Sequence, residues 1–279
     1  MRLILSLAVL LAATGCASLP GLSGGPAIHG NGQRAQDVRA VASLSALKVN
    51  NLGVALQVDV QVGPQPSLRV EADGNLLALI HTEARGDTLH VWTDRPIQGG
   101  GTIHLSYTTP QLHNIVAAGA GQINVAGLDG GALEVVNWGT LGVKLAGKVN
   151  WLGVRVDGSG RVDATQLTSG TTTIGMNGAG DVDLGQVRGS KLSMSMNGAG
   201  KMRARGAVDV LEARANGAGA IDTAALQCTT AELSADGGSH ISATVSQAVV
   251  ARANGASGVT VRGNPAMRTL SGTHIQFVD

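Results

Sequence analysis

Aromatic residues are scarce in this chain, whose 279 residues include three Trp, one Tyr and one Phe. Few stacking surfaces are therefore available of the kind that single-stranded nucleic acids and sugars use. Charged residues are also few, at 14%, and nearly balanced, with 20 Lys and Arg against 19 Asp and Glu. Balanced charge attracts neither nucleic acid nor anionic lipid, so we expect no nucleic-acid partner.

Proline and cysteine are scarce as well, with 7 Pro and 2 Cys. Because Gly does not occupy every third position and Pro is rare, collagen is excluded. With Cys16 in a leader-like segment, Cys228 has no partner for an internal disulfide, and we expect it to be a small buried apolar residue. Glycine, in contrast, is abundant, with 41 residues. Each interior Gly costs a helix about 1 kcal/mol relative to Ala, so the composition predicts an all-β fold.

The first residues resemble the leader of a bacterial lipoprotein. Arg2 supplies a positive charge, and residues 3–13 form an apolar run that is too short to span a bilayer. The sequence Ala-Thr-Gly-Cys follows directly and ends at Cys16, as in the lipobox of such proteins. We therefore predict a signal peptide over residues 1–15 and lipid attachment to Cys16. The alternative is an ordinary secretory signal that is cut near Ala17.

The predicted lipid anchor would place the protein in the cell envelope. Residues 16–36 are rich in Gly, Ser and Pro, which is typical of a flexible tether between lipid and fold. Ala17 follows the modified residue, where Asp would favour retention in the inner membrane of enterobacteria. We therefore expect an outer-membrane location if the cell has two membranes, with the lipid on Cys16 as the contact to the membrane.

The C-terminal half of the chain is repetitive. Short Gly-rich segments, here called corners, recur every 18 to 20 residues, and several read Asn-Gly-Ala-Gly. A nearly constant period over eight copies is typical of a solenoid, in which each repeat forms one coil. The corners begin at Ala118, Asn137, Asp157, Asn177, Asn197, Asn216, Asp236 and Asn254.

Apolar and polar residues alternate on both sides of each corner. The segment Leu192-Ser-Met-Ser-Met196 is an example, and a period of two predicts a strand with one buried face. Each unit is therefore strand, corner, strand and turn, and successive units stack about 4.8 Å apart as a β-solenoid. Stacking in register also predicts a ladder of side-chain amides that includes Asn177, Asn197 and Asn216.

One outward column of the predicted solenoid contains like charges. The position six residues after each corner start is occupied by Val143, Asp163, Asp183 and Arg203 in successive coils. We interpret it as a solvated column that Arg203 partly neutralises. The alternative is a cation site or a catalytic pair formed by Asp163 and Asp183, since carboxylates near 5 Å suit a retaining glycosidase. No further cluster of acids, Lys or His accompanies the pair, so we expect no catalytic residue, metal or cofactor.

Two further features have more than one interpretation. Trp138 and Trp151 both follow a Val-Asn dipeptide. Their rings either cover the core where a corner lacks its glycine, or form an exposed patch that binds a partner. The run from Asp73 to Asn75 is predicted to be a turn whose side chains cap a short helix over residues 76–80, rather than a ligand loop.

The N-terminal half lacks corners but contains alternating strand patterns. The segments Val70-Glu-Ala-Asp-Gly-Asn-Leu-Leu77 and Ser106-Tyr-Thr-Thr-Pro-Gln-Leu112, which lead into the first Gly-Ala-Gly, resemble the DUF2807 family. Its members are called putative auto-transporter adhesins, head GIN domain. The resemblance implies a right-handed β-helix-like fold, a cell-envelope location and no established activity. We expect one domain over residues 37–279, whose strand-rich first part continues into regular repeats over 118–279.

Two classes of function remain. We interpret the chain as a non-catalytic envelope lipoprotein whose rigid solenoid presents a surface for adhesion, or for binding an envelope protein or polysaccharide. The alternative is a β-helix enzyme that acts on polysaccharide through surface carboxylates. A groove that gathers Asp163, Asp183 and Arg203 with Trp138 or Trp151 would favour the enzyme. A polar column without such a groove would favour the binding protein.

Overall fold

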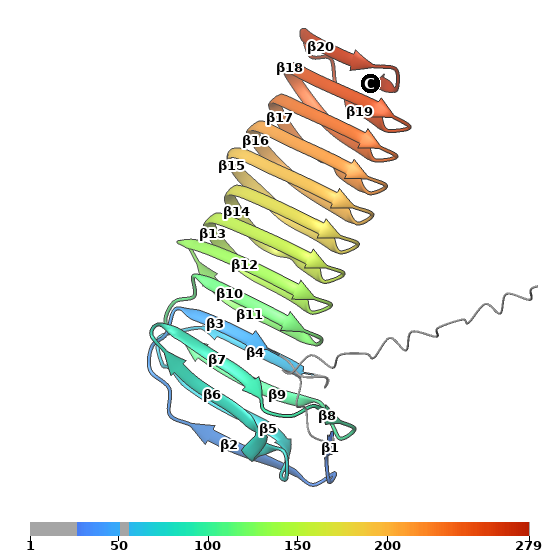
Figure 1. Cartoon of the computed structure of the whole chain (residues 1–279). Helices are drawn as coiled ribbons and strands as arrows, with labels where there is room; N and C mark the ends of the chain where they lie inside the picture. The colour runs from blue at the N-terminus through green and yellow to red at the C-terminus, as the bar shows by residue number, and fades with distance from the viewer. Residues whose placement is uncertain (1–26, 51–55, 279) are drawn as a thin grey trace, which may run out of the picture.

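The computed structural model describes residues 27–50 and 56–278. It is an elongated stack of strands, with the N-terminal strands at one end and the last coil at the other (Figure 1). Strand makes up 77% of the structure and helix 1%, so the predicted all-β class is confirmed. In the described ranges the helical residues form a single 3-10 turn, η1 (Leu77–Leu79), and no helix there is long and apolar enough to cross a membrane.

Six long strands form the regular part of the solenoid, and each makes most of one coil. The first part of each strand lies in one sheet, here called sheet B, and its second part lies in the other, sheet A. Neighbouring coils pair in parallel and in register, as Gly158 with Gly178 and Gly178 with Gly198 show. The predicted β-solenoid is confirmed, with about 8 turns and about 20 residues per turn. The strands are β13 (Gly142–Gly158), β14 (Arg161–Gly178), β15 (Asp181–Gly198), β16 (Lys201–Gly217), β17 (Ala220–Gly237) and β18 (His240–Gly255).

Shorter strands continue both sheets beyond these six. Towards the N-terminal end, sheet A continues through β12 and β10, and sheet B through β11. Towards the C-terminal end, β20 adds to sheet A, while β19 and β21 add to sheet B. Their bounds are β10 (Asn114–Gly119), β11 (Gln122–Asp129), β12 (Ala132–Gly139), β19 (Gly258–Arg262), β20 (Met267–Gly272) and β21 (Ile275–Val278).

The N-terminal strands form a cap whose order in space differs from the order along the chain. β3 and β4 form a coil that pairs in parallel with β10 and β11 on one side and with β7 and β9 on the other. Antiparallel strands then close the stack, with β6 on β7, β5 on β9 and β2 on β5. Their bounds are β2 (Arg34–Arg39), β3 (Ala46–Asn50), β4 (Leu56–Val62), β5 (Ser67–Asp73), β6 (Ile80–Arg85), β7 (Thr88–Thr93) and β9 (Ile103–Thr109).

The ordered fold begins before residue 37, where the sequence placed the end of a tether. β1 (Ile28–His29) pairs with β8 (Ile97–Gln98), and β2 starts at Arg34. Residues 27–36 therefore belong to the cap. The predicted signal peptide over residues 1–15 and the predicted lipidation site Cys16 lie outside the described residues.

The core is a narrow layer of small and aliphatic side chains between the two sheets. Tyr107 of β9 is the one aromatic ring among the fully buried side chains of the described chain, and its hydroxyl donates to the carbonyl of Leu44 at 3.2 Å. A layer this thin has little room for rings, which accounts for their scarcity. One inward column of sheet A consists of Val156, Met176, Met196, Ala215, Ala235 and Ala253, all buried.

The fourth residue of each corner packs against this column, and its size follows the size of the column residue. A side-chain carbon on Gly219 would lie 2.5 Å from the carbonyl oxygen of Gly200 and 2.6 Å from the Cε of Met196, so no side chain fits there. Where the column narrows to Ala215, the corner carries Ser239, whose hydroxyl donates to the carbonyl of Ala215 at 3.0 Å. The change from Gly219 to Ser239 at this position therefore accompanies the narrowing of the column from Met196 to Ala215.

Candidate functional site

The corners arrange one outward residue of each coil into a column on sheet A, here called the Asn ladder. Asn177 Nδ2 donates to Asp157 Oδ1 at 2.7 Å, and Asn197 Nδ2 donates to Asn177 Oδ1 at 3.1 Å. Further along the solenoid, the amide of Asn254 donates to Asp236 at 2.8 Å. The predicted amide ladder forms in part, because Asn177 and Asn197 are bonded, whereas Asn216 is in register with Asn197 but makes no side-chain hydrogen bond within the described residues. The ladder consists of Asp157, Asn177, Asn197, Asn216, Asp236 and Asn254.

The ladder also fixes the charge state of its first member. Asp157 accepts hydrogen bonds from Asn177 and from Arg155, whose Nε lies 2.6 Å from Asp157 Oδ2. The bond from Asn177, followed by that from Arg155, lowers the pKa of Asp157 below its ordinary value. The carboxylate is thus ionised and already paired at neutral pH.

One residue predicted to start a corner does not lie in the ladder. Asn137 is paired in register with Val156 of the inward column and is fully buried, with its amide donating to the carbonyl of Leu141 at 2.7 Å. Trp138 is paired with Asp157 and occupies the ladder position instead. The assignment of Asn137 as a corner start is therefore shifted by one residue, because the step between these two coils is 19 residues and not 20.

The two Trp residues proposed as one patch are separated along the strands. Trp138 is paired with Asp157 near the end of β13, whereas Trp151 lies six residues earlier in β13, where it is paired with Ala132. Six residues of strand span about 20 Å. Both rings face outward from sheet A, with exposed fractions of 56% for Trp138 and 38% for Trp151. The structure therefore places them on one face but not in contact.

The third Trp is engaged within the cap. The ring of Trp92 in β7 stacks on His81 with the ring centroids 5.2 Å apart, and the guanidinium of Arg85 lies 5.0 Å from the Trp92 ring centroid. His81 in turn bonds Asp94 at 2.5 Å. These contacts leave Trp138 and Trp151 as the two Trp rings that are available for a partner.

The outward column that contains Asp163 and Asp183 lies on sheet B. A basic residue flanks this pair on each side, which is one more than the sequence indicated. Lys144, and not Val143, occupies the outward position beside Asp163, since Val143 is buried. Asp163 accepts hydrogen bonds from the hydroxyl of Thr165 at 2.6 Å and from its backbone N–H at 3.0 Å. The hydroxyl bond from Thr165 is the main reason that the pKa of Asp163 is lowered, with Lys144 contributing.

The second carboxylate of the predicted pair is an ion-pair partner. Arg203 Nη1 lies 2.9 Å from Asp183 Oδ1, as the solvated-column interpretation requires. A shallow cavity of about 310 Å³ lies beside Asp163, lined among others by Lys144 and Gln166, but it does not include Asp183. Among the described residues, no group of three or more His, Cys, Asp or Glu side chains is placed to hold a metal ion.

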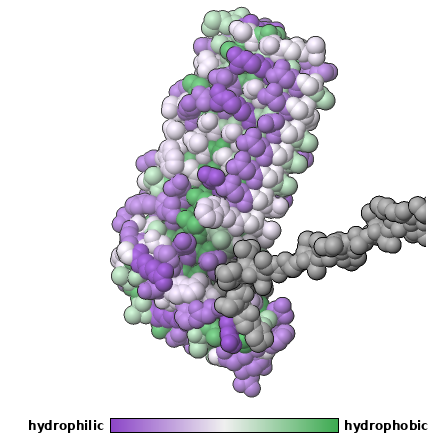
Figure 2. Space-filling model, viewed as in Figure 1, coloured by the Kyte–Doolittle hydropathy of each residue, from purple (hydrophilic) through white to green (hydrophobic). Residues whose placement is uncertain are grey.

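The acidic pair and the exposed Trp rings lie on different sheets. Asp163 and Asp183 belong to the sheet B parts of β14 and β15, whereas Trp138 and Trp151 face outward from sheet A. The groove that would gather these groups for catalysis is therefore not formed. Figure 2 shows hydrophilic residues along the whole visible length of the solenoid.

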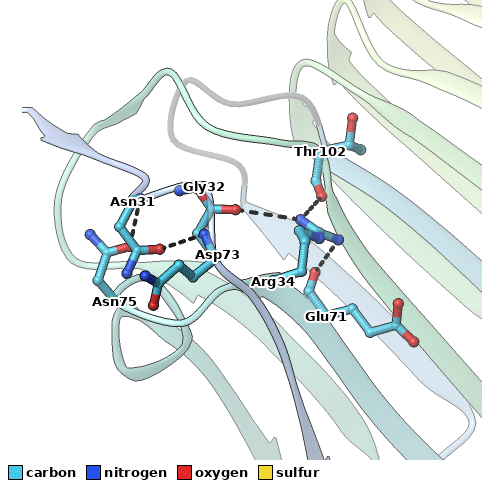
Figure 3. A network of polar contacts seen from close by, with 8 residues as sticks. Asn31, Gly32, Arg34, Glu71, Asp73, Asn75 and Thr102 are labelled. Atoms are coloured by element: carbon cyan, nitrogen blue, oxygen red, sulfur yellow. Dashed lines mark hydrogen bonds and ion pairs between the residues drawn. The ribbon is translucent and has the colours of Figure 1, made fainter.

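A polar network that was not expected from the sequence lies in the cap (Figure 3). Asp73 is 1% exposed, and its Oδ2 accepts a hydrogen bond from the backbone of Gly32 at 2.9 Å. Arg34 Nη1 lies 3.9 Å from Asp73 Oδ1 and donates to the carbonyl of Thr102 at 2.8 Å. Asn75 Nδ2 bonds the carbonyl of His29 at 2.8 Å.

These contacts replace the predicted helix cap. η1 has no side-chain capping bond, and Asp73 and Asn75 instead hold residues 29–34 against the end of β5 and the turn that follows it. These bonds join residues 29–34 to residues 73–75, which are far apart in the sequence, and we call the arrangement the clamp. Its signal in the sequence is a group of Gly residues, since a side chain on Gly30 would overlap the Asp73 carboxylate.

The remaining thiol is structural. Cys228 is buried in β17, and its Sγ contacts the carbonyl of Thr244 at 3.2 Å. Burial raises the pKa of Cys228 to about 12, so the thiol is protonated at neutral pH and is a poor nucleophile. It is buried, as the sequence predicts.

Several solved structures are similar to most of the chain. A putative adhesin from Parabacteroides merdae matches with a TM-score of 0.66 and 14% identity, covering 91% of this chain and 100% of that chain. A putative lipid binding protein from Parabacteroides distasonis gives 0.66 and 19%, and a putative adhesin from the same species gives 0.65 and 15%, with the same coverage. At these identities the similarity shows the fold alone. No curated protein matches the chain.

The family assignment rests on the sequence as a whole. The model of a family described as "Putative auto-transporter adhesin, head GIN domain" matches residues 45–265, a range that extends from β3 of the cap to the last coils of the solenoid. This range confirms the resemblance seen in the segments around Val70 and Ser106. The chain therefore belongs to the DUF2807 family.

Proposed function

We propose that the protein is a non-catalytic adhesin of the bacterial cell envelope, attached by lipid at Cys16 and binding an envelope polymer or protein through its solenoid. The main observation that supports this proposal is that the Asn ladder and its neighbours form a regular array over six coils on the outward face of sheet A. Stacked coils of this kind provide extended binding surfaces. The adhesin description of the family and the adhesin names of fold relatives agree with this role.

The placement of charged groups also supports binding over catalysis. The carboxylates that would act in the enzyme alternative are each occupied, Asp163 by Thr165 and Asp183 by Arg203. They share no groove with an aromatic ring. Catalysis needs several groups that converge on one reacting atom, whereas adhesion needs a rigid and repetitive surface.

The lipid anchor and the binding activity require separate tests. Cells expressing the full chain are labelled with radioactive palmitate and fractionated, in parallel with cells expressing Cys16→Ala. We expect label and membrane association in the wild type and neither in the variant. Equal fractionation of the two proteins would contradict the anchor.

Adhesion is tested by sedimentation. The full-length lipoprotein, purified in a polyoxyethylene detergent, is mixed with envelope fragments of the bacterium that makes it, and the fragments are pelleted. We expect saturable co-sedimentation well above that of serum albumin, which serves as the control. A pelleted fraction equal to that of albumin at every concentration would contradict the adhesin proposal.

A further inference from the structure

The centre of the outward face of sheet A over β13–β15 carries hydroxyl side chains and glycines and no charged side chain. Two of its positions are glycines: Gly175 leaves the sheet without a projecting side chain, and Gly153 is buried beneath the ring of Trp151. Thr173 and Ser195 are exposed and carry hydroxyls that make no side-chain hydrogen bond within the described chain. We call this area the hydroxyl face. It consists of Gly153, Thr173, Gly175, Ser193 and Ser195, bordered by Asn177 and Asn197 of the Asn ladder.

An exposed indole lies at each side of the hydroxyl face. Trp151 folds down onto the sheet, since the distal part of its six-membered ring occupies the space of a side chain on Gly153. Its neighbours in the adjacent coils, Ala132 and Thr171, are small and leave the ring accessible. Trp138 stands at the opposite side, at the start of the Asn ladder. In a chain with only five aromatic rings, two exposed indoles thus border one face.

Most of the charges around the hydroxyl face are paired within the protein; the exception is Glu134, which is in register with Gly153 and accepts a hydrogen bond from Asn114 at 3.2 Å. On one side Arg155 pairs with Asp157 at 2.6 Å. On the other, Lys191 Nζ lies 2.6 Å from Glu212 Oε1, and Arg214 lies 3.1 Å from Glu232. A charged partner would have to compete with these pairs, so the face is electrostatically matched to an uncharged one.

We propose that the hydroxyl face binds an uncharged glycan chain, with Trp151 and Trp138 as stacking platforms. The proposal rests on the adhesin function and names its ligand class. A sugar ring has an apolar C–H face that packs on an indole, and its hydroxyls match the free hydroxyls of Thr173 and Ser195 and the ladder amides. The two rings lie about 20 Å apart along the strand direction, so a chain of several sugar residues is needed to contact both.

The experiment repeats the sedimentation assay with envelope fragments treated in three ways. One sample is untreated, one is oxidised with periodate, which cleaves vicinal diols of sugars, and one is digested with protease. We expect binding to survive protease and to be lost after periodate. Loss after protease with survival after periodate identifies a protein partner and overturns the glycan proposal, while the adhesin function stands. Absence of binding to untreated fragments contradicts the adhesin function itself.

Variants locate the binding site on sheet A. We expect Trp151→Ala and Trp138→Ala to weaken binding to untreated fragments at least tenfold, because stacking rings contribute strongly to affinity. Val210→Ala is the matched control, since Val210 lies on the same sheet with an exposed fraction of 37%, close to the 38% of Trp151. Thermal melting checks that all three variants are folded. Equal affinity of the Trp variants and the Val210 variant would overturn the assignment of this face.

Discussion

At single residues, the strictest requirement in the molecule falls on the glycine that follows each ladder residue. Gly198 has a φ of 145°, a region that residues with a side chain rarely adopt. A side-chain carbon at this position would also overlap the carbonyl oxygen of Gly178 in the preceding coil. Both constraints come from stacking corners in register, so the glycine excess of the sequence is a consequence of the solenoid geometry.

Gly198→Ala should therefore lower the free energy of unfolding by at least about 3 kcal/mol, through backbone strain and displacement of a neighbouring coil. Gly175→Ala is the control, because a side-chain carbon there meets no atom within 4 Å and φ is not positive. Its effect should stay within about 0.5 kcal/mol of zero, as for other surface substitutions. Urea unfolding followed by circular dichroism measures both, and equal stability of the two variants would contradict the argument.

The same scale shows where sequence reasoning succeeds and where it fails. The repeated glycines and the alternation predict corners and inward residues correctly through most of the repeats. The exception is Asn137, which looks like a ladder residue but is buried, because one coil is a residue shorter than its neighbour. A shift of one residue moves a side chain to the other face of a strand, and only the pairing register resolves it. The same one-residue shift placed Val143 in the outward column beside Asp163, where the structure has Lys144.

At the scale of one element, the Asn ladder contains Asn residues at equivalent corner positions, some of which make side-chain hydrogen bonds and one of which does not. Asn177 donates to Asp157 and accepts from Asn197, whereas Asn216 makes no side-chain hydrogen bond within the described residues. Asn177→Ala should thus cost about 1–2 kcal/mol of unfolding free energy, since it removes a bond to a carboxylate and one to an amide.

Asn216→Ala is the control for this prediction, because it changes the same residue type at the same corner position. Its cost should be at most about 0.5 kcal/mol. Thermal melting of the two variants under identical conditions provides the measurement. A larger loss for Asn216→Ala than for Asn177→Ala would show that the ladder bonds do not contribute to stability and that the corner conformation alone decides it.

At the scale of the whole molecule, the cap is the part whose arrangement the sequence could not supply. Its alternating patterns predict the strands of residues 54–107. They do not predict that the coil formed by β3 and β4 lies between the pair β7 and β9 and the pair β10 and β11. The local pattern of a strand specifies which face is buried, not which edge it pairs with. The repeats do not have this ambiguity, because each coil resembles its neighbour in length and sequence.

Acid should destabilise the whole solenoid, because carboxylates on both sheets have lowered pKa values in the fold. The hydroxyl of Thr165 lowers the pKa of Asp163, Lys191 lowers that of Glu212 and Asn177 lowers that of Asp157. A lowered folded pKa gives stability that is present above the unfolded value, about 3.9 for Asp and 4.3 for Glu, and is lost as the pH falls further. The melting temperature should therefore fall once the pH is lowered below about 4.

Asp163→Asn should make this acid transition shallower, since one of the contributing carboxylates is removed. The comparison also tests the cation hypothesis for the column. If repulsion between Asp163 and Asp183 dominated in the absence of a metal, protonation would relieve it, and the melting temperature would rise as the pH falls below 4. Scanning calorimetry between pH 7 and pH 2.5 distinguishes the two outcomes.

The clamp at Asp73 connects residues 29–34 to the N-terminal cap of the solenoid. It holds residues 29–34 through a buried carboxylate, while each coil of the stack contacts mainly its neighbours. Asp73→Ala should therefore loosen the start of β2 without unfolding the coils. Loss of a hydrogen bond to a charged group reduces the cost of local opening by about 1.5–3 kcal/mol, so trypsin should cut after Arg34 at least tenfold faster.

Two measurements separate this local effect from general destabilisation. The cleaved product should begin at Ala35 by mass spectrometry, and the melting temperature should change by less than about 2 °C, since the cap end carries few of the stacking contacts. Asp37→Ala is the control, because Asp37 is a surface residue of the same strand that pairs with Arg39 at 2.9 Å. Equal cleavage of both variants, or a large fall in the melting temperature of Asp73→Ala, would mean that the clamp is part of the solenoid's global stability. If cleavage alone changes, residues 29–34 can detach from the cap while the two sheets of the solenoid stay intact.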